Sequence, residues 1–255
     1  MRNFRILIVI TIILFLILAI VDTVVGIALW WYGLLFLSWF LMMAIGSFSM
    51  SWKFYLNPIT SNKVLTEKKI ALTFDDGPNP EFTLQVLQIL KDYNAKATFF
   101  CLGQHIETYP EILKAIAIDG HDVGNHSFSH DLMIDFNSTE RWLQEIKQTD
   151  NSIHKITGKK TTLFRPPFGV TTPKLARALK VTEHEVIGWN IRSFDTVISN
   201  PQKILKRITK RVHPGAIILL HDKQSNVLFV LEHLLQFLQE HEYQAVTIKE
   251  LLHDN

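Results

Sequence analysis

The stretch KIALTFDDGP (residues 69–78) ends a short apolar run with two adjacent carboxylates, Asp75 and Asp76. Residues 70–74 predict a buried strand, and the Asp-Gly-Pro sequence that follows forces a sharp turn. Both acids are therefore expected at the carboxyl end of the strand, which is the face of α/β barrels on which catalytic groups gather. The alternative is a turn without chemistry, because Asp and Gly readily adopt the conformations that turns need.

A pair of histidines follows downstream, in HSFSH at residues 126–130. On a helical turn His126 and His130 would lie on one face, so that both rings could reach one ion. Surface histidines at this spacing are common, so the alternative is a pair without a metal. Two imidazoles and a carboxylate from Asp75 or Asp76 would form the donor set of a hydrolytic zinc site, and the second carboxylate would remain as a general base.

Two further strand ends carry residues with suitable chemistry. Arg165 stands before two prolines in LFRPPFG (residues 163–169), where the stiff turn places it rigidly and its permanent charge could hold a carboxylate ionised. His221 ends the apolar run GAIILLHD (residues 215–222), where a general acid with a pKa near neutrality could protonate a leaving group. The alternatives are a structural arginine and a core or loop histidine.

Together and in this order, these segments resemble the polysaccharide deacetylase family (carbohydrate esterase family 4, with the NodB-type homology domain). The matching stretches are TFDDGP (73–78), ATFF (97–100), residues 120–126, HSFSH (126–130), RPPFG (165–169) and LLHD (219–222). The resemblance covers about residues 69–252. It implies an α/β fold, an irregular (β/α) barrel of about seven strands, and metal-dependent hydrolysis of an N-acetyl amide.

The resemblance also implies a role for each matched residue. The metal ligands would be Asp76, His126 and His130, for a divalent ion that is zinc by default, although cobalt and nickel suit the same donors. The catalytic group would contain the general base Asp75, the general acid His221, the base-orienting Arg165, and Asp195. The oxyanion and substrate group would contain the backbone N–H of Phe168, together with Pro166 and Trp189.

One segment departs from the family pattern. Residues 189–196 read WNIRSFDT, whereas many members carry Asp-x-x-Asp-Trp after a Trp-bearing strand. Asp195 aligns with the second acid, which in the family helps to set the pKa of the catalytic histidine, but Arg192 replaces the first acid and Thr196 the tryptophan. Phe168 likewise stands where tyrosine is common. The core chemistry should survive, and Arg192 either favours an anionic sugar or lipid phosphate or is a solvated surface residue.

The N-terminal 53 residues have the composition of a membrane segment. Residues 6–21 are apolar except for Thr11, a second uncharged run covers about residues 34–52, and a cluster of Trp and Tyr between them is typical of a membrane–water boundary. We expect two short transmembrane helices in residues 1–53, a polar linker in residues 54–68 and the catalytic domain in residues 69–255. A cleaved signal peptide is the alternative for the first run.

Sidedness and substrate remain open between several possibilities. A hairpin places both chain termini on one side, and the positive-inside tendency would make that side cytoplasmic, whereas a single span would place the catalytic domain outside. We expect an extracytoplasmic, membrane-anchored deacetylase of an aminosugar glycan such as peptidoglycan. The alternatives are a deacylase of a lipid-linked sugar at the cytoplasmic face and a catalytically inactive glycan-binding membrane protein. Beyond Lys53 acids and bases balance, so nothing indicates nucleic-acid binding.

The predicted domain alternates strands with helices, which indicates a parallel barrel or sheet. The expected strands are 70–74, 97–101, 122–125, 162–164, 185–189, 216–220 and 243–247, and the expected helices are 81–93, 109–119, 138–157, 172–181, 200–212 and 226–240.

Overall fold

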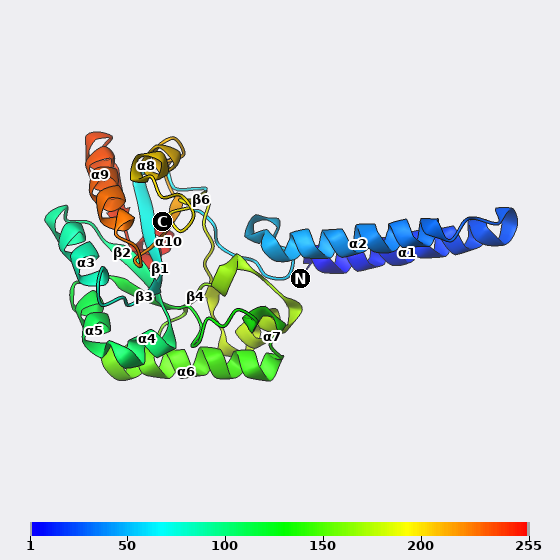
Figure 1. Cartoon of the computed structure of the whole chain (residues 1–255), viewed down its shortest axis with the longest axis horizontal. Helices are drawn as coiled ribbons and strands as arrows, with labels where there is room; N and C mark the ends of the chain where they lie inside the picture. Colours follow the sequence, from blue (N-terminus) through cyan, green and yellow to red (C-terminus); the bar gives the residue numbers. More distant parts are fainter. Residues whose placement is uncertain (1, 254–255) are drawn as a thin grey trace.

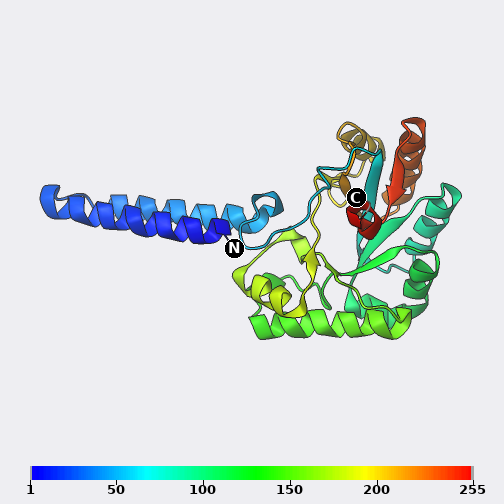
Figure 2. The same cartoon turned by 180° about the vertical axis from the view of Figure 1, so that it is seen from behind.

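The computed structural model describes residues 2–253, and it has a pair of long N-terminal helices that project from an α/β domain (Figure 1). Helices α1 (Arg2–Val25) and α2 (Trp30–Phe48) lie side by side in opposite directions, as both ribbon views show (Figures 1 and 2). The Asp22 carboxylate closes their turn, because it accepts hydrogen bonds from the Ile27 N–H at 2.8 Å and the Tyr32 hydroxyl at 3.2 Å. The start of α1 and the end of α2 therefore both lie next to the domain.

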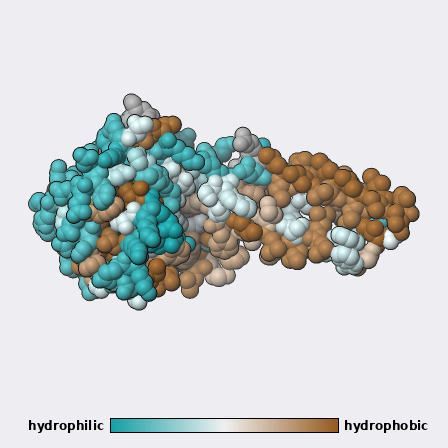
Figure 3. All heavy atoms as spheres, turned by 90° about the horizontal axis from the view of Figure 1, so that it is seen from above, coloured by the Kyte–Doolittle hydropathy of each residue, from teal (hydrophilic) through white to brown (hydrophobic). Residues whose placement is uncertain are grey.

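Both N-terminal helices are long and apolar enough, by length and composition, to cross a membrane. Almost none of their residues are fully buried within the protein, and Figure 3 shows the pair as a hydrophobic projection beside a largely hydrophilic domain. The predicted N-terminal helical segment is confirmed as a pair of apolar helices. That the pair crosses a membrane stays a prediction.

Eight strands form one parallel sheet around the central strand β1 (Lys69–Gly77). The order is β5-β4-β3-β2-β1-β7-β6, and β8 pairs with the first residues of β1. The other strands are β2 (Ala97–Cys101), β3 (Asp122–Asn125), β4 (Leu163–Phe164), β5 (Glu185–Val186), β6 (Ile191–Arg192), β7 (Ile217–His221) and β8 (Gln244–Val246). The predicted irregular (β/α) barrel is confirmed. All of the predicted strands are present, whereas β6 was not predicted.

Helices cover the strands, and the predicted helices are all present with bounds that differ by a few residues. They are α3 (Thr83–Asp92), α5 (Pro110–Ile118), α6 (Thr139–Thr157), α7 (Pro173–Thr182), α8 (Pro201–Thr209) and α9 (Asn226–Glu240). Two short helices, α4 (Gly103–Thr108) and α10 (Ile248–His253), and the 3-10 turns η1 (Met50–Trp52), η2 (Ile134–Phe136) and η3 (Pro167–Gly169) were not predicted. Ser138 caps the N-terminus of α6, because its hydroxyl accepts the Arg141 N–H at 3.2 Å.

The sheet and its helices enclose an apolar core that fixes the strand ends. Phe74 of β1 stacks on Phe99 of β2 with ring centroids 5.0 Å apart, and both rings are buried. Helices α3, α5 and α9 pack over this part of the sheet through residues such as Leu90, Leu113 and Leu234. Because β1 is paired on both sides and covered, its carboxyl end is held firmly, which is where Asp75 and Asp76 lie.

The segment 54–68, which we predict as a linker, forms specific contacts with the domain. The Ile59 N–H donates to the Val186 carbonyl at 2.8 Å, just where β5 ends. The Asn62 N–H donates to the Gly215 carbonyl at 2.8 Å, just before β7 begins. Residues 59–62 therefore lie across the opening of the sheet between β5 and the start of β7.

Candidate active site

A pocket of about 220 Å³ lies at the carboxyl ends of the central strands, where the sequence predicted the site. It is lined by Asp75 and Asp76 from β1, His126 and His130 from the loop after β3, Phe168 and Gly169 from η3, Trp189, Arg192 and Thr196 from the divergent segment, and Leu219, His221 and Lys223 around the end of β7. Arg165 and Asp195 lie behind this wall and contact its residues. Pro166 precedes η3 and is not among the lining residues.

The three predicted metal ligands converge within this pocket. The Nε2 atoms of His126 and His130 each lie 3.5 Å from the same oxygen of Asp76, Oδ1. One ligand atom from each residue lies within 4.8 Å of the others. The His126 Nδ1 faces the Arg165 carbonyl at 2.8 Å, which leaves Nε2 to point toward the other ligands. This donor set fits a divalent cation such as zinc.

Local electrostatics keep two of these ligands in the protonation state that a cation requires. Burial disfavours the charged form of Asp76, but the neighbouring His126 and Lys223 outweigh it and hold the pKa of Asp76 well below its usual range. Burial, assisted by the proximity of His126, lowers the pKa of His130. An ionised carboxylate and a neutral imidazole are the forms that bind metals.

The helical geometry expected for the two histidines is wrong. Residues 126–130 form a loop, in which Ser127 and His130 have positive φ values of 73° and 50°. The loop is held by Glu145, a buried acid on α6 whose Oε2 accepts the N–H groups of Phe128 at 3.0 Å and Ser129 at 2.8 Å. The two rings thus meet through a fixed loop, because α6 supplies the acceptor that the loop backbone needs.

The predicted base and its arginine form a buried ion pair. Arg165 Nη1 lies 2.7 Å from Asp75 Oδ1 and also 2.7 Å from the hydroxyl of Thr73. Nε donates to the carbonyl of Ile187 at 3.2 Å and Nη2 to that of Gly188 at 3.0 Å, so each guanidinium nitrogen has an acceptor although the group is completely buried. Burial lowers the pKa of Arg165, and the Asp75 carboxylate opposes that shift. The pair fixes one carboxylate oxygen and leaves the other, Oδ2, 3.8 Å from His126 Nε2.

The predicted acid forms a second carboxylate pair. His221 Nδ1 lies 2.9 Å from Asp195 Oδ1, and the His221 backbone N–H donates to Asp195 Oδ2 at 2.7 Å. The Ser193 hydroxyl also donates to Asp195, at 2.8 Å. Burial alone would lower the pKa of His221, but the hydrogen bond and charge of Asp195 raise it above its usual value, with help from Asp75 and Asp76. Asp195 thus holds the histidine although the surrounding segment departs from the family pattern.

The rim of the pocket is aromatic and cationic. The Phe168 ring is 45% exposed and lies 4.4 Å, centroid to centroid, from His130. Phe194 lies between two guanidinium groups, with Arg192 at 4.7 Å and Arg207 at 4.3 Å from its ring centroid. In the part of the chain from residue 2 to 253, Arg192 forms no ion pair with an acid, so its charge faces the pocket rim without neutralisation.

Sequence reasoning missed several residues that shape the site. Lys223 donates to Asp76 Oδ2, the oxygen that faces away from the histidines, and nothing in its sequence position indicated this contact. Asp222 is fully buried, accepts the hydroxyl of Thr83, and burial raises its pKa to about 7. Its position beside His221 was the only available signal. Glu145 was missed because it belongs to a distant helix.

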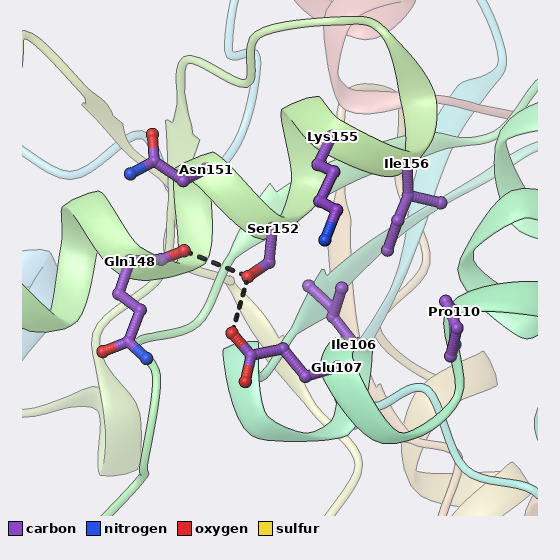
Figure 4. Close-up of a pocket in the computed structure, with 8 residues that line it drawn as sticks. All are labelled: Ile106, Glu107, Pro110, Gln148, Asn151, Ser152, Lys155 and Ile156. Carbon is purple, nitrogen blue, oxygen red and sulfur yellow. Dashed lines mark hydrogen bonds between the residues drawn. The ribbon is translucent and has the colours of Figure 1, made fainter.

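A larger cavity of about 530 Å³ lies between α4, α5 and α6, away from this chemistry (Figure 4). Its contacts are the hydrogen bonds of Ser152 to Glu107 at 3.1 Å and to the Gln148 carbonyl at 3.2 Å. None of the predicted site residues lines it. The pocket at the strand ends is therefore the candidate active site.

Comparison with known proteins identifies relatives of this chain in sequence and in structure. The family model described as polysaccharide deacetylase matches residues 62–187. The peptidoglycan-N-acetylglucosamine deacetylase of Bacillus cereus is 34% identical over 191 residues, which cover 73% of this chain and 89% of that protein. The chain belongs to the polysaccharide deacetylase family. The predicted family and the predicted hydrolase class, which acts on carbon–nitrogen amide bonds, are therefore confirmed.

Other members of the polysaccharide deacetylase family are similar to this chain in sequence and in structure. The peptidoglycan-N-acetylmuramic acid deacetylase PdaC of Bacillus subtilis is 38% identical over 185 residues, which cover 72% of this chain but only 39% of PdaC. The solved structure of PdaC superposes with a TM-score of 0.69 at 37% identity over 73% of this chain and 91% of that structure. A family 4 acetyl xylan esterase from Clostridium thermocellum, solved with a cobalt ion, gives a TM-score of 0.68 at 33% identity over 72% and 90%.

Proposed function

We propose that this protein is a membrane-anchored, metal-dependent deacetylase that hydrolyses the N-acetyl amide of an aminosugar glycan such as peptidoglycan. The observation that carries the proposal is the convergence of the Asp75–Arg165 pair, the His221–Asp195 pair and an Asp-His-His cluster on one pocket. The similar proteins from B. cereus and B. subtilis are named for deacetylation of the two aminosugars of peptidoglycan. The two apolar helices support the membrane anchor.

Asp76, His126 and His130 would hold the cation, for which zinc is the default and cobalt or nickel suits the same donors. When bound, such an ion polarises the amide carbonyl and makes a water molecule easier to deprotonate. The cobalt in the acetyl xylan esterase structure supports a divalent ion on this fold.

The protein's own residues would move the protons. Asp75, held by Arg165, would accept the proton of the attacking water through the oxygen that the ion pair leaves available. The Phe168 N–H would donate to the oxygen that becomes negatively charged. His221, kept protonated by Asp195, would then donate a proton to the amine, which is a poor leaving group until it is protonated.

The decisive experiment measures acetate release from an N-acetylated glycan by the full chain in detergent. Asp75→Asn and His221→Ala should each lower kcat at least about 100-fold, because each removes one proton-transfer step. The matched controls Asp92→Asn and His241→Ala change exposed residues outside the pocket and should not alter kcat. Acetate release at the wild-type rate by Asp75→Asn would contradict the proposal.

A second candidate is a deacylase of a lipid-linked sugar at the cytoplasmic membrane face. The antiparallel pair of helices favours it, because the domain then shares a side with Arg2, Arg5 and Lys53, while the turn between the helices contains Asp22 and no lysine or arginine. Activity on a lipid-linked acetamido sugar, without activity on a wall glycan, would identify this alternative.

A further inference from the structure

The base of the N-terminal helix pair contacts the loop that carries Phe168. The Thr171 N–H donates to the carbonyl of Ser47, in the last turn of α2, at 2.9 Å. Thr171 follows directly on η3 and its cap residue, so this bond joins α2 to the backbone beside the predicted oxyanion donor. The end of α2 therefore contacts the loop beside the catalytic pocket, while the rest of the helix pair projects away from the domain (Figure 1).

Met50, in the turn η1 just after α2, lies against two glycines of the domain. It is 6% exposed, and its sulfur lies 2.8 Å from the position that a Cβ on Gly188 would occupy. Its methyl group lies 3.7 Å from the corresponding position on Gly169, and the ring of Trp189 lies 2.6 Å from that same position. Gly169 thus lies between Trp189, which leaves no room for a side chain there, and Met50, whose methyl group is at ordinary van der Waals distance from that position.

The loop needs such support, because its backbone is not relaxed. Phe168 has φ 55° and ψ 0°, and Gly169 has φ 71°. A left-handed conformation is unfavourable for a residue with a bulky side chain and persists only where the surroundings enforce it. The contacts of Met50 and Ser47 are two of the surroundings that enforce it here.

The helix base is itself fixed to the domain, so it can serve as a support. The Phe4 ring lies 5.1 Å from Tyr55 and 5.8 Å from Phe54, both of which are buried and pack with Ala176 of α7. Gly46 of α2 lies directly against the Phe54 ring. This aromatic cluster joins α1, α2 and α7, so that the base of the helix pair cannot shift independently of the domain.

We propose that Met50 is a positioning residue for catalysis, which holds η3 so that the Phe168 N–H points at the developing oxyanion. The proposal rests on the proposed deacetylase function. It makes the N-terminal helix pair part of the catalytic apparatus, since displacement of α2 relative to the domain would release the loop. Activity would then depend on the contact between the N-terminal helix pair and the domain.

The test compares kcat, KM and bound metal for variants of the full chain in detergent. Met50→Ala should lower kcat about tenfold at unchanged KM, because an oxyanion donor acts mainly in the transition state. Metal stoichiometry should not change, because Met50 is not among the residues that line the pocket with the predicted ligands. The conservative variant Met50→Leu should keep most of the wild-type kcat. Met42→Ala, which changes an exposed methionine of α2, is the matched control and should behave like wild type.

Two outcomes would overturn the proposal: unchanged kcat in Met50→Ala, or a loss of kcat accompanied by loss of bound metal. If Met50→Ala does not fold, Gly46→Ala provides the test, because its new methyl group must displace the Phe54 ring and tilt α2. The kcat of Gly46→Ala should fall at unchanged KM. A wild-type kcat for this variant would overturn the proposal. A wild-type protein without deacetylase activity would instead refute the proposed function itself.

Discussion

Two carboxylate pairs set the charges of individual residues in the pocket. Arg165 is fixed on Asp75 by a bond of 2.7 Å, and Asp195 is fixed on His221 by a bond of 2.9 Å. One pair therefore orients a group that must accept a proton, and the other supports a group that must give one up. The two groups have opposite partners: the cationic Arg165 lies beside the Asp75 carboxylate, and the anionic Asp195 lies beside the His221 imidazole.

The Asp195–His221 pair predicts a specific pH dependence. Because Asp195 raises the pKa of His221 above its usual value near 6.5, the protonated acid persists to higher pH, and the alkaline limb of the kcat/KM profile lies higher than for an isolated histidine. Asp195→Asn should shift that limb to lower pH by about one unit or more. The profile of kcat/KM against pH measures the shift.

The pair formed by Asp150 and His184, 3.2 Å apart and outside the pocket, provides the matched control. Asp150→Asn should leave the alkaline limb where it is in the wild type. An unchanged limb in Asp195→Asn would show that the carboxylate does not set the pKa of the acid.

At the level of single residues, the sequence predicted the site through strand ends and adjacent motifs. Asp75, Asp76 and His221 were found because apolar strands end at them, and the structure brings them together with His126, His130 and Arg165. Lys223 and Glu145 were not found, because their contacts with Asp76 and with the loop backbone join residues far apart in the chain. Such contacts leave no local pattern.

Helix α6 has a function beyond covering the sheet. Its Glu145 accepts two backbone N–H groups from the loop that carries the histidine ligands and is held in turn by Arg141 at 3.1 Å. Asn125, at the end of β3, donates to the Ile146 carbonyl of the same helix at 2.9 Å. The helix thus supports the backbone of the loop that carries both histidines.

Removal of this support should weaken metal binding. Glu145→Ala would leave the N–H groups of Phe128 and Ser129 without their acceptor, and we expect about a 10- to 100-fold lower metal affinity, the usual effect of losing a residue that orients a ligand. Competition with a chelator measures the affinity. Glu140→Ala on the exposed face of the same helix should retain wild-type affinity, and equal affinities for both variants would contradict the assigned role of Glu145.

At the level of elements, long periodic segments were predictable, and the elements that were missed are all short. Helices α6 and α9 and strand β2 lie close to their predicted bounds, because each has enough residues to show a period and end signals. The two-residue strand β6 and the six-residue helix α4 form through pairing and packing with distant elements. The loop at residues 126–130 was expected to be helical, because spacing alone does not distinguish a helical turn from a loop held by α6.

For the whole molecule, composition predicted the apolar N-terminal segment, but not how this segment packs against the domain. The contacts of Met50, Phe54 and Tyr55 depend on where the barrel places Gly169, Gly188 and Ala176, which no local pattern records.

The antiparallel helix pair also has a consequence for topology. If both helices cross the membrane, the domain lies on the same side as the start of α1, and the turn near Gly26 lies on the opposite side.

Reporter fusions test this arrangement and the substrate together. Hydrolysis of a wall glycan requires an extracytoplasmic domain, so a C-terminal alkaline phosphatase fusion should be active and a C-terminal fluorescent protein fusion dark. A fusion placed after Gly26 should report the opposite side, and equal results for both positions would refute the hairpin. The lysines and arginines at the helix base favour a cytoplasmic C-terminus. A C-terminus on that side would exclude mature wall glycan as the substrate. The same chemistry would then act on a lipid-linked aminosugar, whose acetamido group can reach a pocket held close to the inner membrane surface.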